Sequence, residues 1–211
     1  MIYSNEFVWI HFPKAAGSKV ETLFRKYFAS NPSVHQDQVG RRLNPSISWH
    51  DSISDREKRD PSFNLENRRL IVCTRRLSSW LKSRYLFELQ RTPRLEHDPE
   101  LLVTGRFLER SGRVNHADNY VLKWISPSIR LNHGLISYLR VESFASDFLD
   151  IFGQYLDVSK ISISELEQRE NASASVGGKL DVDRLIAANI DSIYKACPLW
   201  AELESEVYGI N

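Results

Sequence analysis

Two short apolar runs, each followed directly by a helical pattern, constrain the fold of this chain most. The run EFVWIHF (6–12) is rich in β-branched and aromatic residues, as in a strand buried on both faces. Apolar side chains then recur at helical spacing over 18–28. The same order returns in RRLIVCTRR (68–76) and the helical pattern over 77–90. Two strand–turn–helix motifs predict a parallel sheet with crossover helices.

The remaining segments fit the same class. A third strand is expected at 136–141, and an amphipathic helix follows it over 143–156. Residues 99–126 are predicted to be helical, with a break near SGRVNHAD, and the end of the chain to be helical on both sides of Pro198. The prediction is an α/β fold of three layers, with a central, mostly parallel sheet flanked by helices. A chain of 211 residues suits one domain, 1–211.

Composition and charge limit the class of partner. The hydrophobic fraction of 42% and the charged fraction of 26% are those of an ordinary globular protein. The formal net charge is +1, so no overall field favours nucleic acid or an anionic membrane, and any anion site must be local. The first residues, MIYSNEF, lack the charged and apolar regions of a signal peptide or membrane span. We expect a cytoplasmic protein without membrane insertion, whose oligomeric state the sequence does not indicate.

The two cysteines give no sign of a metal site. Cys73 and Cys197 lie far apart in the sequence and match no metal-ligand spacing. Cys73 stands in an apolar run, and free cysteines are among the most buried residue types. The prediction is therefore a buried thiol at position 73 and no bound metal.

The loop between the first strand and its helix has the features of an anion site. In HFPKAAGS (11–18), the small residues Ala15, Ala16 and Gly17 let backbone N–H groups approach a ligand closely. The helix N-terminus adds positive potential, and Lys14 adds a full charge. The segment therefore predicts a phosphate-type ligand.

The loop nevertheless departs from the nucleoside triphosphate pattern G-x-x-x-x-G-K-[ST]. Ser18 and Lys19 stand in the reverse order, and Phe12 occupies the position of the first glycine. Ser18 followed three residues later by Glu21 predicts a capping box at the start of the helix.

The loop resembles the 5′-phosphosulfate loop of sulfotransferases that use PAPS (3′-phosphoadenosine 5′-phosphosulfate). The commoner form of that loop is close to H-I-P-K-T-[AG]-G-T, and Ala15 replaces its threonine. The matching positions are His11, Pro13, Lys14, Ala16, Gly17 and, conservatively, Ser18.

This resemblance implies roles for the loop residues. Lys14 is implied to be catalytic, because it would meet the negative charge that grows between sulfate and phosphate. Lys19 has two alternatives: contact with the 5′-phosphate, or a side chain in solvent. The residues implied to bind the cofactor here are Lys14, Ala15, Ala16, Gly17, Ser18 and Lys19.

The second strand–turn–helix motif also resembles this family. CTRRLSSWLKSRYLF (73–87) is similar to its 3′-phosphate element, R-[DN]-P-x-x-R-x-x-S-x-Y, with Arg75, Ser83 and Tyr85 in register. Arg75 ends the strand and Ser83 lies about two turns into the helix, so the resemblance implies that both bind the 3′-phosphate.

Other positions of this element are different or less specific. Trp80 stands where the second arginine is usual, and Arg76 or Arg84 could substitute for it. Lys179 lies in a small, polar, Gly-containing segment (169–179), which resembles the loop that folds over the nucleotide in many relatives. Lys179 is therefore a further candidate for the 3′-phosphate.

The resemblance implies a P-loop-like sulfotransferase fold and transfer of the sulfuryl group from PAPS without a metal. The acceptor would be a hydroxyl of a carbohydrate-like or other small molecule, and catalysis would rest on positioning and charge stabilisation. An acceptor hydroxyl needs a base, and His50 is the predicted one. The alternative for His50 is a surface histidine beside Asp51. His11 is predicted to pack under the loop.

Two other functions stay open at this point. One is a P-loop nucleotide kinase or hydrolase, against which the order of Ser18 and Lys19 counts. The other is a protein that binds PAPS or its bisphosphate product without turnover, which the departures at Ala15 and Trp80 keep open.

Overall fold

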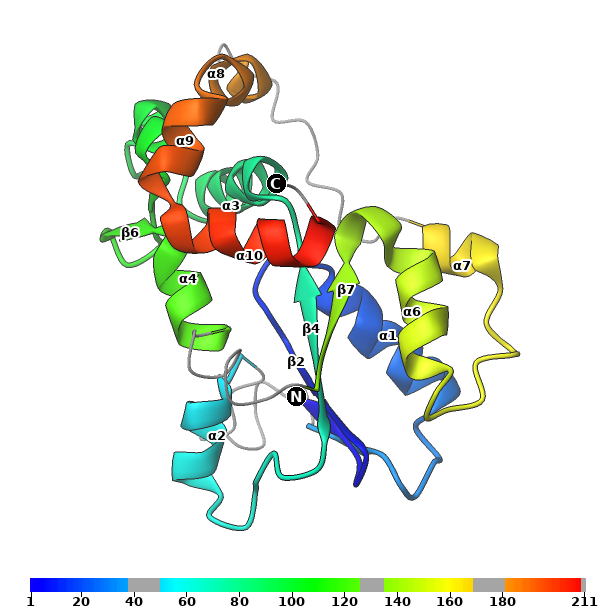
Figure 1. Cartoon of the computed structure of the whole chain (residues 1–211). Helices are drawn as coiled ribbons and strands as arrows, with labels where there is room; N and C mark the ends of the chain where they lie inside the picture. Colours follow the sequence, from blue (N-terminus) through cyan, green and yellow to red (C-terminus); the bar gives the residue numbers. More distant parts are fainter. Residues whose placement is uncertain (38–49, 126–134, 169–180, 210–211) are drawn as a thin grey trace. The chain divides into compact units, whose positions relative to one another are not determined.

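The chain divides into two compact units, each built from two separate segments (Figure 1). Unit 1 contains residues 1–74 and 124–170, and unit 2 contains 75–123 and 171–211. The computed structural model describes residues 1–37, 50–125, 135–168 and 181–209. A single sulfotransferase-like domain over 1–211 stays a prediction.

Unit 1 contains a mixed five-stranded sheet with the order β3–β1–β2–β4–β7. The strands β2, β4 and β7 are parallel, and they are the three strands that the sequence predicts. Two short strands at the edge, β1 and β3, run antiparallel and were not predicted, so the sheet is mixed rather than mostly parallel. The strands are β1 Ile2–Tyr3, β2 Phe7–Ile10, β3 His35–Gln36, β4 Arg69–Thr74 and β7 Ile136–Arg140.

Aromatic side chains attach helices to this sheet. Phe7 of β2 packs its ring edge-on against Phe24 of α1 (Gly17–Tyr27) and Phe152 of α6 (Phe144–Phe152). All four residues of β2 are buried, as expected of a strand whose apolar run has no polar alternation. The other helical elements of unit 1 are α2 Ile53–Arg59, η2 Val141–Ser143 and α7 Ile163–Glu167.

The predicted capping box at the start of α1 is wrong. The helix begins at Gly17 with Ala16 as its N-cap, and no side chain caps it. The carboxylate of Glu21 instead lies 2.9 Å from His11 Nδ1. A capping box does form in α2, where Ser52 and Asp55 exchange side-chain and backbone hydrogen bonds.

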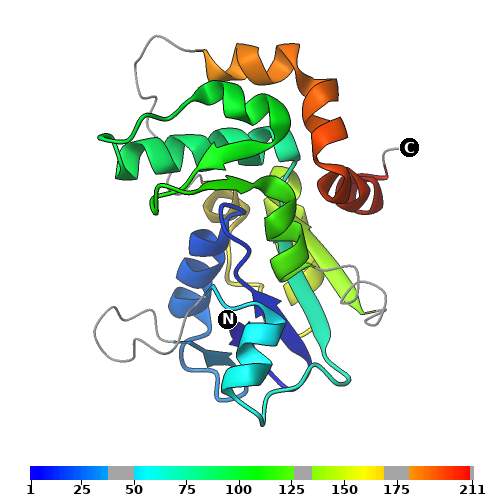
Figure 2. The same cartoon turned by 90° about the vertical axis from the view of Figure 1, so that its left-hand side faces the viewer.

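Unit 2 gathers helices and one hairpin around an aromatic core. The rings of Phe107, Tyr120 and Trp200 pack against Trp80 with centroids 4.6–5.7 Å apart. The hairpin of β5 and β6 lies beside α3 (Figure 2) and replaces part of the helix predicted over 99–126. The elements are α3 Leu77–Arg91, η1 Pro99–Thr104, β5 Arg106–Leu108, β6 Val114–His116, α4 Ala117–Trp124, α8 Val182–Ala188, α9 Ile190–Ala196 and α10 Pro198–Tyr208.

Within the described ranges, no helix has both the length and the apolar character needed to cross a membrane.

Candidate functional site

The loop between β2 and α1 has a backbone of alternating handedness. Lys14 and Ala16 are left-handed, with φ of 66° and 58°. They alternate with Pro13, Ala15 and Gly17, none of which has a positive φ. Such alternation turns successive N–H groups toward one point and forms an anion-binding concavity. A left-handed residue with a side chain costs about 1–2 kcal/mol, and such strain gathers at ligand sites.

The first amides of α1 add donors to this loop. Lys19 N and Val20 N donate to Ala16 O, at 3.0 and 3.3 Å. The N–H groups of Ala16, Gly17 and Ser18 donate no hydrogen bond within the described part of the chain. Unsatisfied amides at a helix N-terminus are a favourable place for an anion. The loop therefore offers three backbone donors in the same segment as Lys14.

The buried His11 lies directly beneath this loop, as the sequence predicts. Its Nδ1 and a carboxylate oxygen of Glu21 are 2.9 Å apart, and both side chains are almost fully buried. A Cβ added to Gly17 would lie 2.1 Å from His11 Nε2. Only glycine therefore fits at position 17 while the ring keeps its place.

His50 lies beside His11. The two ring centroids are 4.4 Å apart and the rings are tilted by 58°. The carbonyl of His50 accepts a hydrogen bond of 3.2 Å from Trp124 Nε1, and Trp124 also packs against Phe12 at the start of the loop. The half-buried His50 is thus not the solvated surface residue of the alternative interpretation.

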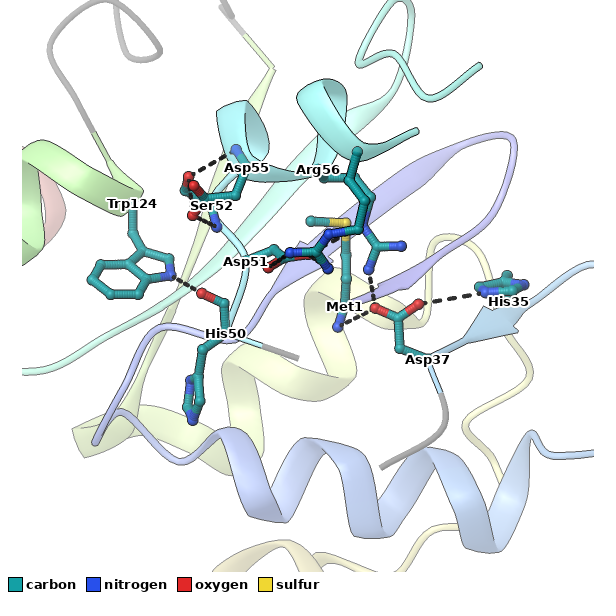
Figure 3. A network of polar contacts seen from close by, with 10 residues as sticks. Met1, His35, Asp37, His50, Asp51, Ser52, Asp55, Arg56 and Trp124 are labelled. Atoms are coloured by element: carbon teal, nitrogen blue, oxygen red, sulfur yellow. Dashed lines mark hydrogen bonds and ion pairs between the residues drawn. The ribbon is translucent and has the colours of Figure 1, made fainter. Parts of the chain in front are cut away.

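A network of buried charges holds the backbone next to His50. Asp51 accepts hydrogen bonds of 2.6 and 2.9 Å from Arg59. Asp37 pairs with Arg56 and lies 3.1 Å from the amino group of Met1. In Figure 3 the His50 ring points away from these charges. The charged side chains therefore hold the backbone segment that carries His50.

The environment of Lys19 decides against one of its two alternatives. Its side chain is buried, so the solvent-facing alternative is wrong. The ammonium donates to the carbonyls of Leu166 and Gln168 and lies 4.9 Å from the centroid of the Phe144 ring. Two of its three N–H groups are thereby used, and its contact with a phosphate stays a prediction.

A buried hydroxyl lies at the same edge of the sheet as Ala15, which lacks the hydroxyl expected at its position. Ala15 is fully buried, so its methyl group faces the interior. Thr74, the last residue of β4, is 2% exposed, and its Oγ1 has no hydrogen-bond partner among the described residues. Ile10 lies opposite Val72 in the parallel pair, so the loop and Thr74 leave the sheet at the same edge. Ligands of α/β sheets bind at this carboxyl edge.

Arg75 begins a second set of candidate residues, in unit 2. Its Nε donates to Ser79 Oγ over 3.0 Å. Ser79 and Ser83 are four residues apart on α3 and therefore share one helix face. Ser79 was missed in the sequence, although its spacing from Arg75 and Ser83 was a usable signal. Lys179 lies outside the described residues.

Trp80 stands at the position of the second arginine in the resembled element, and both Trp80 and its candidate substitute Arg84 contact other residues of unit 2. Trp80 is fully buried in the aromatic core of unit 2. Arg84 forms ion pairs with Glu88 and Glu109, at 2.5 and 3.5 Å. Arg84 therefore cannot substitute for an arginine at position 80 without breaking these pairs.

The N-terminus of α3 carries an internal anion. Leu77 N donates to a carboxylate oxygen of Glu204 from α10, and Tyr194 donates its hydroxyl to the other oxygen over 2.9 Å. Arg76 lies 3.7 Å from the same carboxylate and over the ring of Tyr208. The first amide of α3 is therefore already satisfied.

One further group of side chains was missed in the sequence. His116, Asp118 and Cys197 of unit 2 place one ligand atom each within 4.8 Å of one another. Burial, and secondarily Asp118, raise the pKa of the Cys197 thiol to about 12. Cys73 is buried, as its apolar run predicts, and burial likewise raises the pKa of its thiol to about 12. No local spacing in the sequence signals the group, because 79 residues separate Asp118 from Cys197.

Comparisons with protein-family models, with curated proteins and with solved structures found no match to this chain. The functional assignment therefore rests on the residues and their geometry.

Proposed function

We propose that this chain is a PAPS-dependent sulfotransferase that acts on a hydroxyl of a carbohydrate-like or other small acceptor. The observation that carries the proposal is the loop of alternating handedness at the N-terminus of α1, with Lys14 inside it. Its amides supply donors for a tetrahedral anion. The order of residues in the loop resembles that of 5′-phosphosulfate loops.

Lys14 is the proposed catalytic cation. During transfer, the bond between sulfur and the 5′-phosphate oxygen breaks while the acceptor oxygen bonds to sulfur. Negative charge then grows on the departing phosphate, where a cation lowers the barrier. The amides of Ala16, Gly17 and Ser18, which lack acceptors in the described part of the chain, are proposed to hold this phosphate.

His50 is the proposed base that takes the acceptor's proton. The support is its position: its ring lies 4.4 Å from His11, which is itself beneath the loop and bonded to Glu21. A histidine can accept a proton near neutral pH. We infer that His11 and Glu21 position the ring of His50 but do not react.

Unit 2 supplies a separate candidate for the 3′-phosphate. Arg75 donates to Ser79, and Ser83 lies one turn further on the same helix face. A guanidinium flanked by hydroxyls suits a phosphate dianion. Whether this set and the loop of unit 1 act on one ligand is measurable as an energetic coupling.

Nucleoside triphosphate hydrolysis is the weaker candidate. It would require Lys19 to reach terminal phosphates, whereas its ammonium donates to the carbonyls of Leu166 and Gln168. A second alternative is that the chain binds the donor without turnover. The buried methyl of Ala15, which replaces a threonine hydroxyl, supports this alternative.

Calorimetry with adenosine 3′,5′-bisphosphate is the first test. We expect binding to the wild-type protein, weaker binding in Lys14→Ala and Arg75→Ala, and an unchanged affinity in Lys26→Ala. Lys26 is the matched control, because it is a lysine of the same helix whose exposed ammonium pairs with Glu165 over 2.8 Å. Absence of bisphosphate binding to the wild type would refute the proposal.

Turnover is tested by following radiolabelled sulfate from PAPS to a panel of sugars and phenols. Lys14→Ala is expected to lower the rate by about 10²–10³, as for loss of an oxyanion donor. His50→Gln is expected to lower the rate and leave bisphosphate affinity unchanged. Tight binding without transfer to any acceptor would instead assign the chain to the binding proteins. A double-mutant cycle between Lys14 and Arg75 measures whether both contribute to one ligand.

A further inference from the structure

Three potential metal ligands meet within unit 2, although they come from distant parts of the sequence. His116 ends β6, Asp118 lies in the first turn of α4, and Cys197 joins α9 to α10. His116 Nε2 is 3.9 Å from Cys197 Sγ, and the ligand atoms of all three residues lie within 4.8 Å of one another. An imidazole, a carboxylate and a thiol in one cluster are the ligand types that zinc prefers.

A glycine closes one side of this cluster. Gly105 has φ of 68°, and a Cβ at this position would lie 2.1 Å from Cys197 Sγ and 3.2 Å from His116 Nε2. Its position is fixed, because its N–H donates to Leu102 O and its carbonyl accepts from Ala117 N, each over 2.9 Å. The side chains of His116 and Cys197 thus rest on bare backbone, as in a site built to close dimensions.

The charges of the cluster also favour a cation. Asp118 is buried and forms no ion pair among the residues that the structure describes. Its two oxygens accept N–H groups from Leu199 and Trp200, over 3.1 and 3.0 Å, which orients the carboxylate. A carboxylate and a thiolate side by side would repel each other, whereas a divalent cation between them neutralises both charges.

We propose that His116, Asp118 and Cys197 bind a zinc ion, with a water or an external ligand in the fourth position. Zinc at about 2.3 Å from sulfur and 2.0 Å from nitrogen separates these two atoms by about 3.5 Å. The cluster needs to contract only slightly from its present 3.9 Å. The site lies wholly in unit 2 and does not depend on the proposed sulfotransferase activity.

Binding moves two protons. Asp118 N donates to His116 Nδ1 over 3.2 Å, so the neutral ring carries its proton on Nε2. When zinc binds to Nε2, this proton moves to Nδ1 and the long hydrogen bond is lost. The thiol proton of Cys197 is released to solvent, because the thiolate is the ligand. Zinc therefore joins β6 and α4 to α10.

Cobalt titration of the metal-free, full-length protein tests the site. We expect a thiolate-to-cobalt charge-transfer band that zinc abolishes by displacement, and a higher melting temperature with zinc than with a chelator. Cys197→Ser is expected to abolish the band, whereas the control Cys73→Ser, which alters the other buried thiol, keeps it. A band that is absent from the wild type, or unchanged in Cys197→Ser, overturns the proposal.

Two further variants keep the test decisive if Cys197→Ser does not fold. His116→Gln and Asp118→Asn retain the thiol and are each expected to weaken cobalt affinity at least tenfold. Circular dichroism establishes that each variant is folded before titration. Wild-type cobalt affinity in both folded variants excludes this ligand set.

Discussion

The N-termini of α1 and α3 show two solutions to the same local problem. Each helix follows a parallel strand of the sheet and starts with amides that have no partner inside the helix. At α3, Glu204 of the same unit accepts from the first amide. At α1, the amides of residues 16–18 have no acceptor within the described ranges. The comparison teaches that a strand–turn–helix motif keeps amides available to a ligand only where no internal carboxylate accepts from the helix end.

The backbones of the two N-caps differ in the same sense. Ala16 is left-handed at φ 58°, whereas Arg76 has φ −58° and ψ 137°, which any residue adopts. Strain is therefore found at the N-terminus of α1, whose amides have no described acceptor, and not at the N-terminus of α3, where Glu204 accepts. Strained backbone that a fold retains is a common property of binding loops.

The largest expected effect comes from removing the carboxylate that accepts from the N-terminus of α3. Glu204→Ala removes the acceptor of the buried Leu77 N–H and of the Tyr194 hydroxyl, and we expect a loss of about 3 kcal/mol in the free energy of unfolding. Urea titration measures this loss, with the exposed Glu206→Ala on the same helix as control. Added sulfate should restore part of the stability of Glu204→Ala only. An unchanged stability would show that the internal anion does not hold α3.

Adding a side chain at the N-terminus of α1 should have the next largest effect. In Gly17→Ala the new methyl would overlap the His11 ring at 2.1 Å and displace it from Glu21. We expect about 2 kcal/mol of destabilisation from this overpacking and the loss of measurable bisphosphate binding in calorimetry. Gly153→Ala is the control for overpacking outside the loop. Its methyl would meet Leu149 O at 2.4 Å in α6 of the same unit. Retained binding in Gly17→Ala would show that the ligand does not need a close approach to the backbone at position 17.

Glycine at the two N-caps should act in opposite directions. Ala16→Gly relieves a left-handed backbone and should stabilise the protein by up to about 1 kcal/mol. The Arg76→Gly variant should be less stable than Arg76→Ala by about 0.5–1 kcal/mol. Glycine gives the unfolded chain more conformational freedom, and at this position it relieves no backbone strain. Thermal unfolding of Ala16→Gly, Arg76→Gly and Arg76→Ala makes the comparison. Equal signs at the two positions would show that Ala16 is not strained.

The smallest effect concerns the hydroxyl at the end of β4. Thr74→Val keeps the shape and removes a buried Oγ1 without a described partner, so stability should rise by about 1 kcal/mol or less. If the hydroxyl contacts the bound anion in place of one at position 15, the same variant should bind the bisphosphate several-fold more weakly. Thermal unfolding with and without the bisphosphate separates the two effects. A valine variant that gains stability and keeps its affinity would leave Thr74 outside the site.

The sequence predicted the regular elements near the loop well, because they follow from local patterns. The strands β2, β4 and β7 and the helices α1 and α3 appear where apolar runs and helical spacing indicate them. The edge strands β1 and β3 have two residues each, too few for a pattern. The sequence predicts helix over 99–126 where the structure has a hairpin, since strands of three residues each are too short for a pattern.

The candidate site was predictable in its residue types but not in its contacts. Lys14, Gly17 and His11 stand in a short contiguous loop, so their proximity follows from the sequence. The sequence predicts Glu21 as part of a cap, whereas the helix starts at Gly17, so Ala16 and not Ser18 is the N-cap residue and Glu21 pairs with His11. The solvent-facing alternative for Lys19 is wrong, because its carbonyl acceptors are almost 150 residues further along. Long-range partners of this kind carry no local signal.

The division of each unit into two segments has a consequence for synthesis on the ribosome. The sheet of unit 1 needs β7 and can form once the chain has emerged to about residue 170. Unit 2 must also wait for Trp200 of α10, against which Trp80 packs at 4.6 Å. At about 5–20 residues per second, α10 emerges about 2–8 s later. During that interval the nascent segment 75–123 lacks the ring of Trp200 that packs against Trp80, so we expect the aromatic core of unit 2 to close last.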